Sequence, residues 1–398
     1  MRTASTVPPA AHAPATTASC TLRELLLYFL HLGSFGFGGP IALTGYMQRD
    51  LVERRGWITK QDYLEGLALA QLAPGPLAAQ LAIYLGWIRA GILGATLVAI
   101  AFVLPSFVMV LALSALYVRF GGLSWMQGAF YGIGAAVIAI IARSAFKLTR
   151  LTLGRDLWLW TVFGANALLT GWSESEIIWA FALSGLLSWL VKAPWRARAA
   201  AHGLAFAGMP WLVAGIHGPA AAETLWRIGL YFAEAGAFVF GSGLAIVPFL
   251  YAGVVRDFQW LSDRQFLDAV AVAMITPGPV VITVAFIGYL VGGPLGATVA
   301  AIAVFLPCYL LVIIPAPFYR RFAGNHSLKA FVDGVTAAAT GAIAGAAVVL
   351  GRRSIFDLQT VLIFVATLAV LLKLKKAPEP LVILAAGVVG LALKGLAS

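Results

Sequence analysis

The sequence contains few charged residues, few cysteines and few histidines. Only 11% of its 398 residues are charged, against roughly a quarter in an ordinary soluble domain. Its two cysteines, Cys20 and Cys308, support neither a disulfide framework nor a metal cluster, and its five histidines show no metal-ligand spacing. The motif G-x-x-x-x-G-K-[ST] is absent, so ATP does not act directly through a P-loop. We therefore expect no metal and no cofactor.

Apolar residues make up 61% of the chain and form long continuous runs. These runs predict an all-α polytopic membrane protein, because a membrane β-barrel would show short alternating segments instead. The net charge of +11 indicates basic cytoplasmic loops in a chain this apolar, so we expect the lipid bilayer, and no nucleic acid, as a partner. Residues 1–20 are rich in Ala, Pro and Thr without an apolar core, which predicts a disordered tail rather than a signal peptide.

An internal repeat divides the chain. A shift of 203 positions, which becomes 202 after a one-residue deletion, aligns the two halves over about 100 residues. The predicted domains are a first repeat at 21–192, a linker at 193–222 and a second repeat at 223–398, and each repeat contains six apolar segments. The aligned residues include Phe35 with Phe238, Gly38 with Gly241, Trp57 with Trp260, Glu65 with Asp268, Pro74-Gly75-Pro76 with Pro277-Gly278-Pro279, Pro105 with Pro307, and Gly132 with Gly334.

The positions of the basic residues predict how the two repeats insert. If every apolar segment crossed the bilayer, the 27 Lys and Arg residues would divide 13 to 14 between the two sides, which violates the positive-inside rule. If the Pro-Gly-Pro segment of each half enters and returns on the same side, the division becomes 19 to 8. This predicts two inverted-topology repeats, each with about five transmembrane helices and one re-entrant Pro-Gly-Pro hairpin, and both termini outside. The eight basic residues of the poorer side are Arg2, Arg23, Arg119, Arg256, Arg264, Arg352, Arg353 and Lys394.

Glycine and proline interrupt the apolar runs twice in each half. The interruptions are FGFGGPIAL (35–43) and QLAPGPLAAQ (71–80) in the first half, and FVFGSGLAI (238–246) and MITPGPVVIT (274–283) in the second. A helix that begins just after such a break presents unpaired N–H groups, which bind anions. Four such helix ends near the midplane predict a site for a compact anion, although packing and kinks are the alternative use of these residues. The predicted substrate-binding residues are Gly38, Gly39, Pro40, Gln71, Pro74, Gly75, Pro76, Gln80, Gly241, Ser242, Gly243, Thr276, Pro277, Gly278, Pro279 and Thr283.

Five titratable residues within apolar runs are candidates for a proton pathway or a gate, since charges cost several kcal/mol at mid-bilayer. Glu65 and Asp268 are aligned by the repeat, and each precedes its Pro-Gly-Pro by nine residues. The alternative for this pair is an interfacial position near a helix N-terminus. Glu234, His31 and Asp333 lie deeper in apolar runs, and a hydrogen-bonded packing role is the alternative for His31.

The stretch FGFGGPIALTGYMQRDLVERRGWITKQDYLEGLALAQLAPGPLAAQLAIYLGW (35–87) resembles the signature region of the chromate ion transporter family. Residues 240–280 resemble the second domain of that family, and the resemblance extends over residues 22–396, as in its long, two-domain form. Two residues depart from the family pattern: Leu43 stands where a polar residue is common, and Ser242 stands in a turn that is usually all glycine.

The resemblance implies a secondary transporter that exports chromate across a bacterial-type cytoplasmic membrane, driven by the proton motive force, and so confers chromate resistance. Sulfate or another oxyanion, carried outward or inward, is the alternative substrate, and protons are the implied second partner. An intramembrane enzyme and a channel are remote alternatives, because the chain shows no catalytic motif and an inverted duplication favours alternating access. A monomer and a homodimer both remain open.

Overall fold

The computed structural model describes residues 20–37, 39–120, 124–173, 178–192, 222–238, 246–318, 326–355, 357–374 and 378–395. All regular elements within these ranges are helical. The predicted disordered tail lies outside them except for Cys20, whose side chain is buried. The predicted linker also lies outside them except for Ala222, the first residue of a helix.

The helices of the first half follow the order of the predicted apolar segments. The N-terminal helix opens with a capping box, in which Thr21 and Glu24 bond each other's backbone N–H groups and so stabilise the helix end. The elements are α1 (Leu22–Phe35), α2 (Gly39–Met47), the π-helical η1 (Gln48–Arg54), α3 (Lys60–Leu72), α4 (Leu77–Phe120), α5 (Ser124–Leu153), α6 (Leu157–Ser173) and α7 (Ile178–Lys192).

The second half repeats this order with small differences. Its elements are α8 (Ala222–Phe238), α9 (Ile246–Tyr251), the π-helical η4 (Ala252–Asp257), α10 (Asp263–Ile275), the 3₁₀ turn η5 (Val280–Ile282), α11 (Thr283–Ile313), the 3₁₀ turn η6 (Ala316–Phe318), α13 (His326–Ser354), α14 (Leu358–Lys373) and α15 (Glu379–Gly395).

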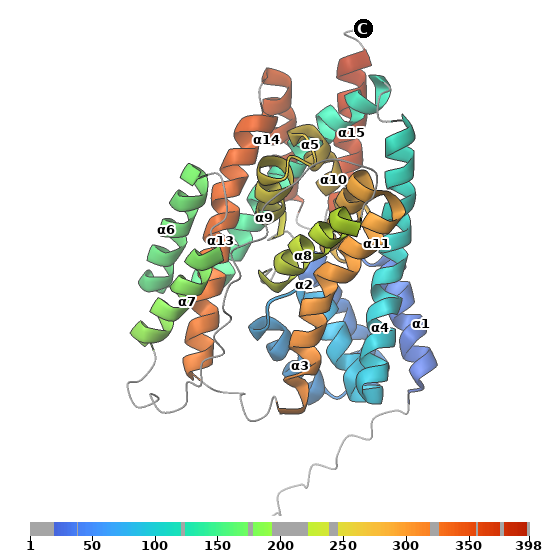
Figure 1. Ribbon diagram of the computed structural model, residues 1–398, viewed down its shortest axis with the longest axis vertical. Helices are drawn as coiled ribbons and strands as arrows, with labels where there is room; N and C mark the ends of the chain where they lie inside the picture. Colours follow the sequence, from blue (N-terminus) through green and yellow to red (C-terminus); the bar gives the residue numbers. More distant parts are fainter. Residues whose placement is uncertain are drawn as a thin grey trace, which may run out of the picture.

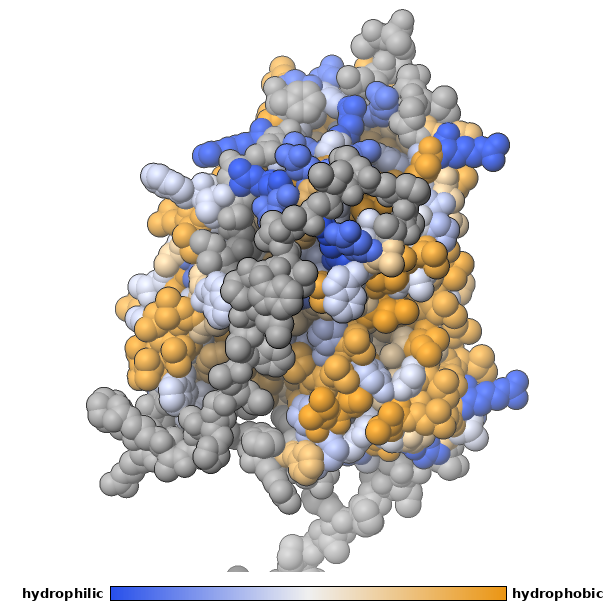
Figure 2. Space-filling view, viewed as in Figure 1, coloured by the Kyte–Doolittle hydropathy of each residue, from blue (hydrophilic) through white to orange (hydrophobic). Residues whose placement is uncertain are grey.

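Several of these helices are long and apolar enough to cross a membrane. Among the described residues they are Leu77–Phe120, Trp125–Arg150, Val280–Phe318 and Lys329–Arg352, and α7, α14 and α15 are shorter apolar helices. Large apolar side chains cover much of the middle of the face drawn in Figure 2, whereas hydrophilic side chains gather toward its upper end. An apolar surface of this extent suits lipid contact. The chain is an all-α membrane protein.

Both α4 and α11 consist of two helices joined at a kink. The backbone leaves the helical region at Ala90 and Gly91 in α4, and at Gly292 and Gly293 in α11. Gly91 has φ +58° and Gly293 has φ +63°, a left-handed conformation that glycine adopts with little strain. In α4 the chain then folds back on itself, so that a Cβ placed on Gly86 would lie 2.5 Å from the carbonyl oxygen of Gly94.

Two glycines let the first helix of each half approach the second part of its long helix. A Cβ on Gly33 of α1 would overlap the carbonyl oxygen of Phe102 in α4, and one on Gly236 of α8 would overlap that of Val304 in α11. Small residues at such contacts allow membrane helices to pack backbone against backbone. The two contacts use positions that the sequence repeat aligns.

The two halves are interleaved. The α6 and α7 helices pack on α13, and the α14 and α15 helices pack on α5. In Figure 1, α6 and α7 accordingly lie to the left beside α13, while α14 and α15 stand at the top beside α5. The helices α4 and α11 also pack together, and the hydroxyls of Thr96 and Tyr309 are 2.6 Å apart across this contact. The core is therefore shared between the halves.

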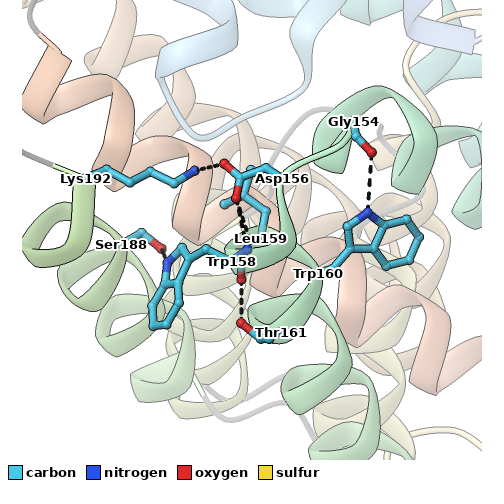
Figure 3. Close-up of polar contacts among 8 residues, drawn as sticks. All are labelled: Gly154, Asp156, Trp158, Leu159, Trp160, Thr161, Ser188 and Lys192. Atoms are coloured by element: carbon cyan, nitrogen blue, oxygen red, sulfur yellow. Dashed lines mark hydrogen bonds and ion pairs between the residues drawn. The ribbon is translucent and has the colours of Figure 1, made fainter.

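A polar cluster joins the ends of α6 and α7 (Figure 3). The Asp156 carboxylate accepts hydrogen bonds from the backbone N–H groups of Trp158 at 3.0 Å and Leu159 at 3.3 Å, and it forms an ion pair with Lys192 at the end of α7. The Trp158 indole donates to Ser188 at 2.9 Å. The hydrogen bond from Lys192 holds the pKa of the Asp156 carboxyl below its usual value of 3.8. These contacts fix α6 against α7 at this end.

Candidate functional site

The chain breaks at both Pro-Gly-Pro tripeptides. The α3 helix ends at Leu72 and α4 begins at Leu77, with Gly75 at φ +139° between them. The second break follows α10, with Gly278 at φ +97°. Only glycine adopts such backbone angles without strain. The sequence predicted that an α-helix begins at Pro279. Instead the 3₁₀ turn η5 follows Pro279, and α11 begins after it at Thr283.

The helix before each Pro-Gly-Pro turn, α3 in the first half and α10 in the second, begins at a side-chain cap; we call each such helix, its turn and the helix that follows a hairpin. The Thr59 hydroxyl accepts from the backbone N–H of Asp62 at 3.0 Å ahead of α3, and the Ser262 hydroxyl accepts from that of Gln265 at 3.3 Å ahead of α10. Such caps satisfy N–H groups that a helix start leaves unpaired. Thr59 and Ser262 are aligned by the 203-residue shift, so both hairpins are built from the same local signals.

The tip of each hairpin packs against the other half of the chain. A Cβ on Gly75 would lie 2.5 Å from Cys308 Cβ on α11, and one on Gly278 would lie 2.7 Å from Ser106 Oγ on α4. The backbone N–H of Gly278 also donates to the carbonyl oxygen of Gly36 at 3.0 Å. The second Pro-Gly-Pro turn is thus bonded to the glycine-rich break that follows α1.

Gln80 supplies the polar side chain of the first turn. It is fully buried in the first turn of α4, and its Nε2 donates to the carbonyl oxygen of Pro74 at 2.6 Å. The opposite amide orientation would set two acceptors against each other, so this hydrogen bond fixes which atom is Oε1. The buried Oε1 has no hydrogen-bond partner. A buried acceptor without a partner costs free energy that a donor such as a water molecule would recover.

The glycine-rich break of the first half starts at the end of α1. Gly36 caps this helix, and Gly39, with φ +74°, and Pro40 are the first residues of α2. Leu43, the departure from the family pattern, is buried, and its side chain lies where a Cβ on Gly36 would be. Leu43 therefore closes this break with apolar packing where a polar side chain would have offered a hydrogen bond.

The other predicted binding residues differ in how deeply they are buried. Gln71 is exposed at the end of α3. Thr276 and Thr283 are buried at the second turn, and their hydroxyls donate to the carbonyl oxygens of Ala273 at 3.0 Å and Val280 at 2.7 Å. Pro76, Pro277 and Pro279 are also buried. Four predicted residues lie outside the described part of the chain: Gly38, Gly241, Ser242 and Gly243.

The aligned carboxylates Glu65 and Asp268 occupy different environments. Asp268 is only 4% exposed and accepts a 2.7 Å hydrogen bond from the Tyr117 hydroxyl near the end of α4. Glu65 is half-buried and accepts from Gln61 on its own helix at 3.0 Å. The pair is thus equivalent in sequence but not in structure.

The remaining proton or gate candidates are dispersed. The sequence placed His31 and Glu234 deep in apolar runs, but both residues are exposed, and the His31 ring lies against Phe35. Asp333 is half-buried on α13, and the positive charges of Lys329 and Lys192 lie near enough to interact electrostatically with its carboxyl group. The three residues lie on three different helices, α1, α8 and α13.

Sequence reasoning missed Ser106, Cys308 and Tyr117. Ser106 and Cys308 each follow the proline of an aligned Leu-Pro pair, so the repeat itself offered a signal for them. Tyr117 lies near the end of a 44-residue helix, and nothing in its local sequence distinguishes it.

An apolar cavity of about 250 Å³ lies between α4 and α11. Its lining includes Phe102, Phe107 and Phe305 and is almost wholly apolar. An anion would find no charge there and few donors, so this cavity does not suit a charged ligand.

The donors suited to an anion lie instead at the helix start beside Gln80. The first N–H groups of an α-helix have no partner inside the helix, and they carry the positive end of its dipole. No Lys or Arg is among the buried residues of the described chain, and no cluster of metal-ligating side chains occurs in the same part. If an anion binds at this helix start, backbone N–H groups and the Gln80 amide are the donors at hand.

Comparisons with known proteins show the family to which the chain belongs. The family model described as "Chromate transporter" matches residues 23–189 and 226–391. The chain is 58% identical to the chromate transport protein of Cupriavidus metallidurans over 94% of each chain. It is 57% identical to the probable chromate transport protein of Synechococcus elongatus over 93% of this chain and 95% of that one. It is 33% identical to the chromate transport protein of Pseudomonas aeruginosa over 92% and 91%. No solved structure matches the chain.

Proposed function

The chain belongs to the chromate transporter family, and we propose that it exports chromate from the cytoplasm through a site at its Pro-Gly-Pro turns. The observation that carries the site is the buried start of α4 directly after the first Pro-Gly-Pro turn, where the first backbone N–H groups of the helix lie beside the buried amide of Gln80. Chromate is a tetrahedral dianion, and its oxygens suit the unpaired N–H groups of a helix start. The Gln80 amide nitrogen donates to the Pro74 carbonyl oxygen in this structure, so in the proposal it exchanges that partner for an oxygen of the bound anion.

Re-entrant hairpins and inverted repeats are part of the proposal. The α3 helix has 13 residues and the first part of α4, from Leu77 to the kink at Ala90, is about as long, so each rises about 20 Å. A bilayer core is about 30 Å thick, so a helix pair of this length suits a hairpin that enters and returns on one side. Broken helices in inverted repeats bind substrates near the midplane of secondary transporters.

The cytoplasmic side of the first hairpin is proposed to attract the anion. Exposed cations surround its entrance, and the Arg55 guanidinium lies 4.4 Å from the centre of the Trp57 ring. Clustered positive charge raises the local concentration of anions. The exposed cations are Arg49, Arg54, Arg55, Lys60 and Arg89.

The electrical part of the proton motive force is sufficient to drive export. Moving one charge across 100 mV is worth about 2.3 kcal/mol, so a dianion leaving a negative interior gains about 4.6 kcal/mol. That gain corresponds to an outward gradient of about three orders of magnitude. Export of this kind would lower cytoplasmic chromate and so confer chromate resistance. We place the protein in a bacterial cytoplasmic membrane with both termini outside.

Inside-out membrane vesicles test this function, because export appears in them as uptake. Wild type is expected to accumulate labelled chromate when the vesicles are energised. Changing both Gly75→Ala and Gly278→Ala should abolish uptake, since alanine fits neither backbone angle nor the space beside Cys308 and Ser106. The matched control is Gly134→Ala with Gly164→Ala, two glycines with open space around them.

Each result has a defined meaning. Uptake lost in the first variant and kept in the control supports the proposal. Uptake of sulfate at an equal rate would make chromate one of several oxyanion substrates. Absence of energised uptake by wild type would refute export, and uptake that survives Gly75→Ala with Gly278→Ala would assign the two turns to packing.

A further inference from the structure

The two Pro-Gly-Pro hairpins differ in how deeply their first helices are buried. On α3, Leu64 is 49% exposed and Gln71 is exposed. The aligned positions on α10 are Leu267, which is half-buried, and Met274, which is 6% exposed. Sequence-equivalent hairpins are therefore held in different environments: the first helix of the first hairpin is the more exposed, and we call this hairpin open, whereas that of the second is the more buried, and we call it closed.

A hydrogen bond between two side chains joins the first helix of the closed hairpin to the other half of the chain. The Tyr117 hydroxyl donates to Asp268 Oδ2 at 2.7 Å. The Tyr117 ring packs edge-on against Phe286, at 5.2 Å between ring centres, and against Phe130, at 5.7 Å. The contact thus connects α10 with the end of α4 inside an aromatic cluster.

The Asp268 carboxylate can have either of two hydrogen-bond partners, Tyr117 or water. A carboxylate within the membrane is costly unless it is paired or reaches water. While α10 is packed, Tyr117 supplies a hydrogen bond to the buried Asp268. If α10 moved outward, water would replace Tyr117 as the partner. The cation that acts on Asp268 is Arg264, one turn earlier on the same helix and itself exposed.

We propose that the Tyr117–Asp268 hydrogen bond is the latch that closes the outer side of the transporter, and that this structure is the conformation open to the cytoplasm. The inference rests on the proposed topology, in which the second hairpin opens to the outside. In a carrier built from equivalent repeats, one closed and one open hairpin give access from one side. Access from the other side then requires the latch to break, which shifts the population between the two states.

Cysteine labelling tests the latch without any substrate. The reporter is Val272→Cys, one turn after Asp268 and 4% exposed. The background carries Cys20→Ser and Cys308→Ser, and a membrane-impermeant maleimide is added outside intact cells. Tyr117→Phe is expected to raise the labelling rate about tenfold, since one hydrogen bond to a charged group is worth about that factor. Tyr289→Phe, a half-buried tyrosine on α11, should leave the rate unchanged.

An unchanged labelling rate in Tyr117→Phe would overturn the latch. A second variant covers the case in which Tyr117→Phe does not insert: Tyr117→Cys with Asp268→Cys, joined by a reducible bis-thiosulfonate crosslinker. The crosslinked protein should stop transporting chromate, and reduction should restore transport. Full transport while crosslinked would also overturn the latch. If wild type carries no chromate, the proposed function fails, whereas the labelling result still decides the latch.

Discussion

Cys308 on α11 lies so close to Gly75 that a Cβ added to Gly75 would come within 2.5 Å of its Cβ. The 202-residue shift aligns Cys308 with Ser106, and Ser106 lies against Gly278 in the same manner, with its Oγ 2.7 Å from a Cβ added there. Each Pro-Gly-Pro turn is thus closed by the residue that follows a helix proline in the other half. The geometry of both turns depends on the packing of α4 against α11.

Substitutions at Cys308 should follow side-chain size. Cys308→Ser places there the residue that Ser106 already provides at the other turn, so transport is expected to stay close to wild type. Cys308→Leu overfills a site with no space beside Gly75, at a cost in stability of about 1–3 kcal/mol, and should displace the turn and so reduce the transport rate. Initial rates of chromate uptake in inside-out vesicles, normalised to inserted protein, measure both. Equal rates for the two variants would show that the contact is not critical.

Gln80 should control substrate affinity. Gln80→Leu removes the Nε2 donor, which bonds Pro74 in this structure and would turn to a bound anion, so chromate binding is expected to weaken about tenfold, the value of one hydrogen bond to a charged group. Gln80→Glu should weaken it further, because it places a negative charge beside an anion. Gln61→Leu on the exposed face of α3 is the control. Equilibrium binding of labelled chromate to purified protein gives the result, and unchanged affinity in Gln80→Leu would remove this residue from the site.

The breaks in the helices were predictable from the sequence because their cause is local. Pro74-Gly75-Pro76 and its aligned copy interrupt a helix wherever they occur, and Thr59 and Ser262 are recognisable caps. Ser106 and Cys308 were missed because their role arises from contact between distant segments, although their aligned positions after Leu-Pro pairs offered a signal.

The difference between Glu65 and Asp268 could not be predicted, because the repeat makes the two residues equivalent in sequence. Asp268 is buried with Tyr117 of the distant helix α4 as its partner, whereas the hydrogen bond of Glu65 with Gln61 lies within α3. His31 and Glu234 lie within apolar segments and still face outward, since a membrane helix exposes an apolar face to lipid and apolar neighbours do not indicate which side is the core.

The driving force should be electrical. In energised inside-out vesicles, valinomycin with potassium removes the membrane potential and is expected to abolish chromate uptake, because a dianion gains about 4.6 kcal/mol per 100 mV from that potential. Nigericin removes the pH gradient alone and should leave uptake largely intact. The reverse pattern would show that proton exchange drives transport.

The contact between α6 and α7 should stabilise the fold in a pH-dependent manner. The lowered pKa of Asp156 means that its contribution is present above pH 3.8 and is lost as the pH falls through the still lower pKa of the folded state. Asp156→Ala should cost about 1 kcal/mol at neutral pH through the lost helix cap. Asp156→Asn keeps a cap and should cost less, since the partly exposed ion pair contributes little. Thermal unfolding in detergent at neutral and acidic pH checks both, and equal losses at both pH values would contradict this account.

Chromate binding to the purified protein tests the central claim most directly, because it depends on neither topology nor driving force. Wild type, Gly75→Ala with Gly278→Ala, and Gly134→Ala with Gly164→Ala would be compared by equilibrium binding of labelled chromate. The account predicts that wild type and the Gly134→Ala, Gly164→Ala protein bind chromate with similar affinity. The Gly75→Ala, Gly278→Ala protein should lose at least tenfold in affinity, which corresponds to about 1.4 kcal/mol. Equal affinity in all three proteins would contradict an anion site at the Pro-Gly-Pro turns.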